Sequence, residues 1–257
     1  MSIYDHYRKE EYVFVDQVMN WKEQVIERYS PKLTDFLDLR EQTIMSSVIG
    51  NNPDCLVTFF GGQVDIERKR ALIHPSYYTP TEDDFSLIAF DIKYASKFHS
   101  LSHRQVLGTL MSLGMKRSKF GDILMKDEII QLVVAEEIGS FVENNLNSVG
   151  KSPIKLMEIP FNELIEQENE WQTKNGSVSS LRLDVLLSEF YNISRQKAQA
   201  LIKAEYVKVN QRVIDSTSFI CGEGDLFSVK GYGRGMLLSI DGMSKKEKWR
   251  INYGVKK

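Results

Sequence analysis

Cysteine and long apolar runs are both scarce in this sequence of 257 residues. Its two cysteines, Cys55 and Cys221, lie far apart and outside any Cys-x-x-Cys spacing, which argues against a disulfide framework and a zinc ribbon. No stretch has the ~18 consecutive apolar residues that a membrane span needs, and the polar start lacks a signal-peptide core. We therefore expect a cytoplasmic protein without a membrane partner, in which both cysteines act as small apolar residues.

The sequence also lacks a strong net charge, because 33 Lys and Arg nearly balance 35 Asp and Glu and leave −2. Taken alone, this value argues against a nucleic-acid binder. The average hides two unlike parts, however. Residues 180–257 carry fourteen basic and eight acidic residues, a net charge of +6, whereas residues 1–179 carry −8. A basic module on an acidic remainder is typical of a chain in which one part meets a polyanion.

Hydrophobic residues make up 42% and charged residues 26% of the chain, which excludes wholesale disorder and fibrous classes. The length suggests roughly two domains, or three small ones. Residues 1–80 are expected to form an N-terminal helical or α+β domain. Its expected elements are a helix over 15–29 that stops at Ser30-Pro31, a cap and restart over 34–38, a helix over 40–48, a strand over 55–60 and a helix or turn over 67–73.

The middle part, residues 83–160, alternates strand and helix patterns. Their order, strand-helix-strand-strand-helix-strand, is that of the split unit of ferredoxin-like folds. RNA-recognition modules share this order with many enzymes and metal carriers, so the order does not decide the function. A linker is expected over 163–176. The expected strands of the middle part are 86–92, 120–125, 129–134 and 154–159, and the expected helices are 102–113 and 136–147.

Residues 180–240 carry the most specific pattern in the chain. A helix opens at Leu181, a second one over 195–203 has Ser194 as its cap, and short strands follow over 207–213 and 226–230. The fixed positions of this stretch are Arg182-Leu183-Asp184, Ser194-Arg195, Ala198, Leu201-Ile202-Lys203, Val207-x-Val209-Asn210, Gly224-Asp225 and Lys230-Gly231. Together they resemble the S-four domain, a small α-L RNA-binding module.

Two positions depart from the S-four pattern. Glu205 stands where the family usually has Gly, and Gln211 stands where Gly often follows Asn. The basic residues of this part suit phosphate contacts, which fix position but carry little sequence information. The alternative is a solvated basic face with no ligand. The candidate RNA-binding residues of the module are Arg182, Ser194, Arg195, Gln196, Lys197, Lys203, Lys208, Asn210, Arg212, Lys230 and Arg234. Residues 241–257 are expected to form a basic tail. Its segment 245–250 combines basic residues with Trp249, which indicates either contact with a base or phosphate or a packed tryptophan beside solvated lysines.

Five further strings, at 34–42, 59–62, 67–71, 113–123 and 231–235, extend the resemblance over nearly the whole chain. Together they are similar to the YlmH-like proteins of Gram-positive bacteria. The resemblance implies a helical N-terminal part and a ferredoxin-like middle domain, itself considered RNA-binding, before the S-four domain. It also implies binding to large-subunit ribosomal RNA and to tRNA or peptidyl-tRNA, a role in quality control of stalled ribosomal subunits, and a link to cell division. We expect a monomer.

In the middle part, Lys116, Arg117 and Lys119 lie between the first helix and the second strand. An ordinary solvated loop is the alternative to RNA contact, and the resemblance favours contact. Arg68, Lys69 and Arg70 are equally ambiguous, and we expect one of them to pair with a nearby acid.

An RNA-modifying enzyme of the pseudouridine synthase or methyltransferase kind is the alternative function. Asp184 lies in a segment similar to the catalytic Gly-Arg-Leu-Asp of pseudouridine synthases, but it is better interpreted as a helix-start carboxylate. The glycines of 231–235 have no room for a Rossmann unit after them. His99 and His103 have no third metal ligand nearby in the sequence. We therefore expect no catalytic residue, no metal and no cofactor.

Overall fold

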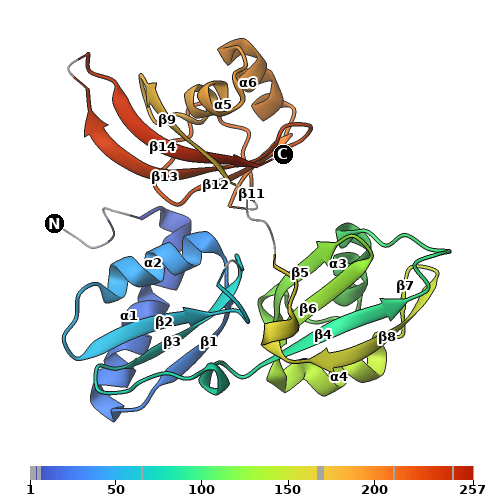
Figure 1. Cartoon of the computed structure of the whole chain (residues 1–257). Helices are drawn as coiled ribbons and strands as arrows, with labels where there is room; N and C mark the ends of the chain where they lie inside the picture. Colours follow the sequence, from blue (N-terminus) through green and yellow to red (C-terminus); the bar gives the residue numbers. More distant parts are fainter. Residues whose placement is uncertain are drawn as a thin grey trace. The chain divides into compact units, whose positions relative to one another are not determined.

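The computed structural model describes residue 4 and residues 7–64, 66–166, 171–210, 212–244 and 246–256 (Figure 1). The chain divides into two compact units, Met1–Glu168 and Asn169–Lys257. The first unit contains an N-terminal and a middle domain, and the second unit contains the basic module. None of the helices within these described ranges is both long and apolar enough to cross a bilayer.

The N-terminal domain packs two helices against a three-stranded antiparallel sheet of order β1-β3-β2. Its core joins Val15 and Val18 of the first helix to Ile44, Met45 and Ile73. The predicted helices and the strand over 55–60 are confirmed, and the three-stranded sheet makes this an α+β domain, one of the two expected forms. The elements are α1 (Tyr12–Arg28), β1 (Lys32–Leu37), α2 (Leu39–Ile49), β2 (Cys55–Phe60) and β3 (Lys69–Pro75).

Two segments of this domain differ from the prediction. The expected helix or turn over 67–73 is wrong, because this segment enters the central strand β3, which is buried from Arg70 to Pro75. The charges that suggested a surface turn belong to arginines whose guanidinium groups are hydrogen-bonded inside the protein. The expected cap over 34–38 lies at its last residue, since Glu41 N donates to Asp38 Oδ1 at 2.9 Å while the preceding residues form β1.

The middle domain has the predicted ferredoxin-like architecture. Its strands follow the order β5-β6-β4-β8-β7, and neighbouring strands are antiparallel. Phe90, Phe120 and Leu132 of the sheet pack with Leu110 and Val142 of the two helices. The elements are β4 (Leu87–Tyr94), α3 (His103–Ser112), β5 (Phe120–Lys126), β6 (Ile129–Ala135), α4 (Gly139–Asn145), β7 (Ser148–Val149) and β8 (Ser152–Ile159).

The opposite face of this sheet is partly covered by the chain itself. Residues 161–165, here called the strap, cross the face and are held by Gln131, whose Nε2 donates to Glu163 O at 3.0 Å. Ile165 N in turn donates to Gln131 Oε1 at 2.7 Å. Phe36 of β1 belongs to the buried apolar cluster on this face of the sheet. RNA-recognition modules stack bases on this face of the sheet. The covered part of the face is therefore closed to that mode of binding.

The C-terminal unit is a six-stranded sheet of order β11-β10-β12-β13-β14-β9 with two helices on one side (Figure 1). Its core joins Leu186, Leu187 and Phe190 to Ile202 and Phe227. The elements are β9 (Gln172–Val178), α5 (Leu183–Tyr191), α6 (Arg195–Lys203), β10 (Val207–Val209), β11 (Arg212–Val213), β12 (Leu226–Val229), β13 (Gly233–Met243) and β14 (Trp249–Lys256).

The basic tail and part of the linker differ from the prediction. In the described part of residues 241–257, β13 ends and β14 follows, paired on both sides. Residues 172–176 of the expected linker belong to β9, whose Val178 lies opposite Trp249. Residues 167–170 of that linker lie outside the described residues. The strand was missed because β9 is an edge strand with mostly exposed side chains, which leaves no apolar alternation to detect.

The departure at Glu205 has a backbone explanation. Its φ is +58°, in the left-handed region where a residue with a Cβ is strained by about 1–2 kcal/mol. We expect Glu205→Gly to raise the free energy of unfolding of the C-terminal unit by about 0.5–1 kcal/mol in urea titrations. Ala204→Gly is the matched control. Ala204 has a φ of −82°, so glycine at this position should lower the free energy of unfolding instead. Equal effects of both substitutions would contradict the explanation.

Candidate nucleic-acid interface

A buried carboxylate orders the basic face of the C-terminal unit, which is the surface formed by Arg182, Arg195, Lys197 and Lys203. Asp184, in the first turn of α5, has a fully buried side chain. Its Oδ1 accepts a hydrogen bond from Arg182 Nε at 3.1 Å. Its Oδ2 accepts from Arg195 Nε at 2.9 Å and from Gln199 Nε2 at 2.7 Å. One carboxylate thus joins the residue before α5 to two residues of α6 and orients both guanidinium groups.

The charge of Asp184 is favoured despite its burial. Burial raises the pKa of the carboxyl, but the hydrogen bonds from Arg182, Gln199 and Arg195 outweigh burial, so the pKa lies below its usual range. The helix-start position predicted for Asp184 is confirmed, and the contact with α6 is additional.

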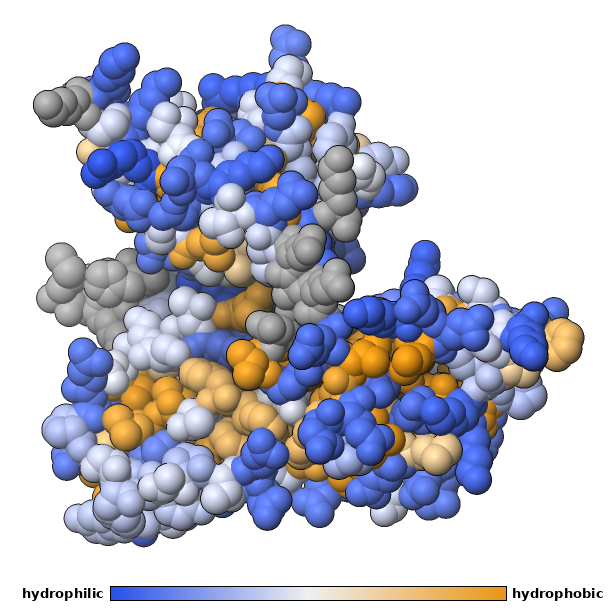
Figure 2. Space-filling view, viewed as in Figure 1, coloured by the Kyte–Doolittle hydropathy of each residue, from blue (hydrophilic) through white to orange (hydrophobic). Residues whose placement is uncertain are grey.

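The first turn of α6 presents the exposed part of this face. Ser194 caps the helix and accepts a hydrogen bond from Lys197 N at 3.2 Å. Arg195, Gln196 and Lys197 follow it with exposed side chains, and Lys203 is exposed in the last turn. In the view of Figure 2 the surface of the C-terminal unit is mostly hydrophilic. The structure therefore brings Arg195, Gln196 and Lys197 together at the start of α6, with Lys203 at its other end.

The remaining predicted residues of the module are distributed over its strands and turns. Lys208 is exposed on β10, and Lys230 Nζ lies 4.4 Å from the centre of the Tyr206 ring. The amide of Asn210 serves the turn, because Nδ2 donates to Asp225 Oδ1 at 2.9 Å and Oδ1 accepts from Leu226 N at 2.9 Å. Arg212 and Arg234, on β11 and β13, are exposed and half-buried, respectively. Gln211 lies outside the described residues.

Lys248, which was predicted to lie in the basic tail, is a neighbour of the basic face. It lines a polar hollow of about 220 Å³ together with Arg195, Glu189 and Ser177. The two cations attract a phosphate group, but the Glu189 carboxylate repels it. The mixture of lysines and Trp249 over residues 245–250 was the available signal, but the strand that carries it there was not predicted.

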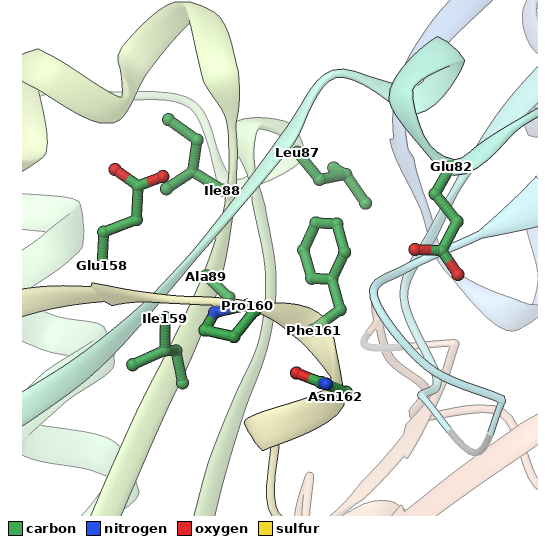
Figure 3. Close-up of a pocket in the computed structure, with 9 residues that line it drawn as sticks. All are labelled: Glu82, Leu87, Ile88, Ala89, Glu158, Ile159, Pro160, Phe161 and Asn162. Atoms are coloured by element: carbon green, nitrogen blue, oxygen red, sulfur yellow. The ribbon is translucent and has the colours of Figure 1, made fainter.

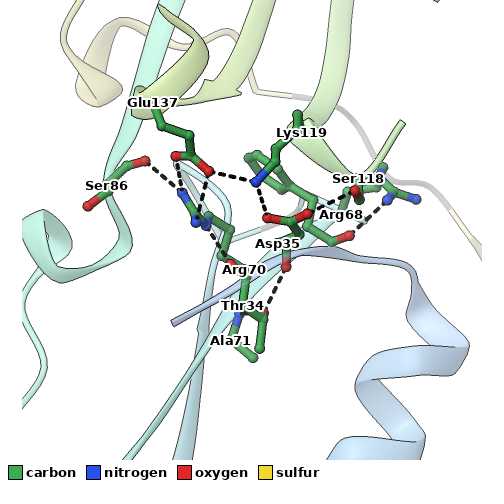
Figure 4. Close-up of polar contacts among 10 residues, drawn as sticks. Thr34, Asp35, Arg68, Arg70, Ala71, Ser86, Ser118, Lys119 and Glu137 are labelled. Carbon is green, nitrogen blue, oxygen red and sulfur yellow. Dashed lines mark hydrogen bonds and ion pairs between the residues drawn. The ribbon is translucent and has the colours of Figure 1, made fainter. Parts of the chain in front are cut away.

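Two of the three basic side chains in the predicted loop of the middle domain bind other groups of the protein. Lys119 Nζ lies 2.5 Å from Asp35 Oδ1 and 2.9 Å from Glu137 Oε1 (Figure 4). Arg117 Nη1 donates to Phe120 O at 2.6 Å, and burial, followed by the nearby Arg68 charge, lowers the pKa of Arg117 to about 10. Lys116 is exposed. RNA contact by these three residues stays a prediction.

Arg68 and Arg70, whose role the sequence leaves open, connect the N-terminal and middle domains. Arg70 Nη1 lies 3.1 Å from Glu137 Oε2, which confirms the expected pairing with an acid (Figure 4). Arg70 also donates to Thr34 O at 2.7 Å and to Ser86 O at 3.0 Å. Arg68 is buried and donates to Phe36 O at 2.9 Å. The guanidinium groups of Arg68 and Arg70 therefore bind groups of the protein itself.

Beyond the strap, the middle sheet exposes a second basic surface. Lys93 and Lys155 stand directly opposite each other on β4 and β8, an arrangement in which like charges repel. Lys93 Nζ is 2.7 Å from Asp91 Oδ2. Met157 and Ile129 are 47% and 44% exposed on the same face of the sheet. The two lysines make this part of the sheet a candidate contact for a nucleic-acid backbone, although Asp91 partly neutralises Lys93.

The pocket at the other end of this sheet has different chemistry. Figure 3 shows Leu87, Pro160 and Phe161 along its wall, with the carboxylates of Glu82 and Glu158 nearby. Its volume is about 410 Å³. Two carboxylates would repel a phosphate, so this pocket does not extend the basic surface.

Metal-ligating side chains form no comparable site in the described residues. Within those ranges, no three His, Cys, Asp or Glu side chains gather closely enough to hold a metal ion. Cys55 and Cys221 are both buried, as predicted, and burial raises the pKa of the Cys55 thiol.

Comparisons with known proteins agree with this geometry. The family model described as "Putative RNA-binding domain in YlmH" matches residues 80–163, and the S4 domain matches residues 181–227. "Ribosome-associated protein quality control protein P2" of Bacillus subtilis (strain 168) is 45% identical over 252 residues, 98% of each chain. The solved structure of "Cell division protein ylmH from Streptococcus pneumoniae" is 31% identical, with a TM-score of 0.55, over 64% of this chain and 100% of that chain. The chain therefore belongs to the YlmH family of S4-domain proteins.

Proposed function

We propose that this protein is a non-enzymatic RNA-binding factor that docks on large-subunit ribosomal RNA and on tRNA. We place it in ribosome-associated quality control of stalled peptidyl-tRNA complexes. The observation that carries the proposal is the Asp184 carboxylate, which holds Arg182 and Arg195 beside the exposed start of α6. The name of the Bacillus subtilis relative, which matches nearly the whole chain, supports the process.

The arrangement suits recognition of RNA shape rather than of base sequence. Guanidinium groups whose positions are fixed can bind phosphate oxygens in pairs with little further loss of freedom. Lys197 and Lys203, on the same helix, add exposed cations that strengthen binding by releasing counterions. Structured RNA is read largely through its backbone and its unpaired bases. Binding through this face should therefore weaken steeply as salt increases.

The middle domain would supply a second contact. The uncovered part of its sheet carries Lys93 and Lys155, and its loop carries the exposed Lys116. Two modest contacts on one chain raise the overall affinity through effective concentration. We include in the proposal a cytoplasmic monomer and the link to cell division that the name of the Streptococcus pneumoniae relative suggests.

Charge reversal on α6 tests this proposal. We expect Arg195→Glu combined with Lys197→Glu to abolish co-sedimentation of the full chain with large ribosomal subunits, because two phosphate contacts become repulsions. The matched control is Arg28→Glu with Lys32→Glu, which makes the same charge change at exposed positions of the N-terminal domain. Circular dichroism checks that both variants fold. Unchanged co-sedimentation of the α6 variant at moderate salt would refute the assigned face.

A further inference from the structure

The C-terminal unit contains a hollow of about 830 Å³ that the basic face does not account for. One side is formed by the end of α5, at Phe190 and Tyr191, and another by the turn between β12 and β13. The floor comes from β9 and β14, which lie outside the segment matched by the S4 model. The volume is within the range of about 300–1,000 Å³ that is usual for small-ligand sites.

Backbone conformation keeps this hollow open. α5 ends at Asn192 in the left-handed conformation, with φ of +49°, so the chain leaves the helix abruptly. Gly231 and Gly233 have φ of +84° and +88°, which favours glycine at both positions. A Cβ on Gly231 would meet no atom within 4 Å, so the space beside it is empty of protein.

The lining combines aromatic rings with cations. The rings of Tyr191 and Tyr232 lie 5.6 Å apart and are tilted by 58°. Lys197 Nζ, from the basic face on α6, lies 5.4 Å from the centre of the Tyr232 ring. Lys174 of β9 is an exposed member of the lining. The pocket is therefore continuous with the basic face, and its positive charge matches a phosphate.

We propose that this pocket takes a single unstacked RNA base, with Tyr232 as the stacking surface and Lys174 beside the attached phosphate. The proposal rests on the RNA-binding function proposed above. Loops and bulges of structured RNA offer bases that are splayed out, and aromatic side chains are their usual partners. Stacking on a ring tolerates any base, so the pocket would add affinity with little sequence preference. Burial raises the pKa of the Tyr191 hydroxyl, which keeps this hydroxyl neutral at physiological pH.

Saturation-transfer NMR on the full chain tests the pocket directly. The probes are the four ribonucleoside 5′-monophosphates, with ribose 5-phosphate as the probe without a base. We expect saturation of the base protons for the wild type, loss of this signal in Tyr232→Ala, and its retention in Tyr232→Phe, which keeps the ring. Tyr206→Ala is the control outside the pocket, and Lys174→Glu, at an exposed position, should weaken the signal without affecting the fold. Absence of base signals for the wild type, or equal signals in Tyr232→Ala and Tyr232→Phe, would overturn the proposal.

Co-sedimentation with large subunits separates this inference from the proposed function. Tyr232→Ala should weaken subunit binding about tenfold, the usual effect of losing one stacked base. The α6 charge reversal should abolish subunit binding while leaving part of the nucleotide signal. A chain that binds subunits but none of the monophosphates would refute the pocket alone. A chain that binds the monophosphates but not subunits would refute the proposed function alone.

Discussion

Asp184→Asn is expected to destabilise the C-terminal unit by about 3 kcal/mol, because a buried carboxylate that orders two arginines is replaced by a neutral amide. The amide oxygen accepts fewer of the hydrogen bonds that now come from Arg182, Arg195 and Gln199. Hydrogen exchange of the full chain measures the effect in α5 and α6, with α3 of the first unit as the internal reference. RNA affinity should fall as well, since both guanidinium groups lose their common anchor.

The same carboxylate predicts how stability depends on pH. The pKa of Asp184 is lower in the folded chain than its usual value of about 3.9, so its ionised form favours folding. This contribution is complete above the pKa of the unfolded chain and is lost as the pH falls through the lower, folded value. The wild-type C-terminal unit should therefore lose stability below about pH 4.

Comparison of two variants isolates this effect. The unfolding free energy of Asp184→Asn should depend less on pH in this acid range than that of the wild type. Asp215→Asn is the control, because it removes a carboxylate from an exposed position of the same unit. If Asp184→Asn and the wild type lose stability in parallel between pH 5 and pH 2, the role assigned to the buried carboxylate is incorrect.

Arg70→Met is expected to destabilise the first unit by about 4 kcal/mol. The substitution leaves the Thr34 and Ser86 carbonyl oxygens without their guanidinium donor and removes the ion pair with Glu137 (Figure 4). The side chain of Arg70 is only 6% exposed, so water cannot readily replace it. The readout is faster hydrogen exchange in β1 and β3, with α6 of the other unit as reference.

Lys69→Met is the matched control for this prediction. Lys69 precedes Arg70 on β3 but donates to Val64 O at an exposed position, so its loss should change stability by less than about 1 kcal/mol. Glu137→Gln, alone and combined with Arg70→Met, completes a double-mutant cycle that isolates the ion pair. Purely additive effects would show that the backbone carbonyls, rather than Glu137, account for the stability that Arg70 supplies.

The sequence predicts the middle domain well because its apolar patterns are strong. The strands over 120–125 and 129–134 and the helix over 102–113 all match the structure within a few residues. In the C-terminal unit, the two helices and the short strands match because fixed positions indicate a known module. The family resemblance is confirmed over the full chain.

The features that the sequence does not predict depend on interactions between residues far apart along the chain. Arg68 and Arg70 resemble surface residues until their backbone carbonyl partners, distant in sequence, are known. The role of Asp184 between α5 and α6 requires knowledge of the packing of the two helices. β9 has a polar sequence, and its pairing with β14 decides its structure. The position of Lys248 beside Ser177 was not predicted for the same reason.

The pairing of β9 with β14 also orders the steps by which the C-terminal unit forms. These two strands are neighbours in the sheet although the whole S4 segment separates them along the chain. Contacts between α5 and α6, and between β12 and β13, close much shorter loops and should form earlier during folding. We expect the outer strand to close last, and with it the floor of the hollow beside Tyr232. A folding intermediate would thus present the helical basic face before the base pocket exists.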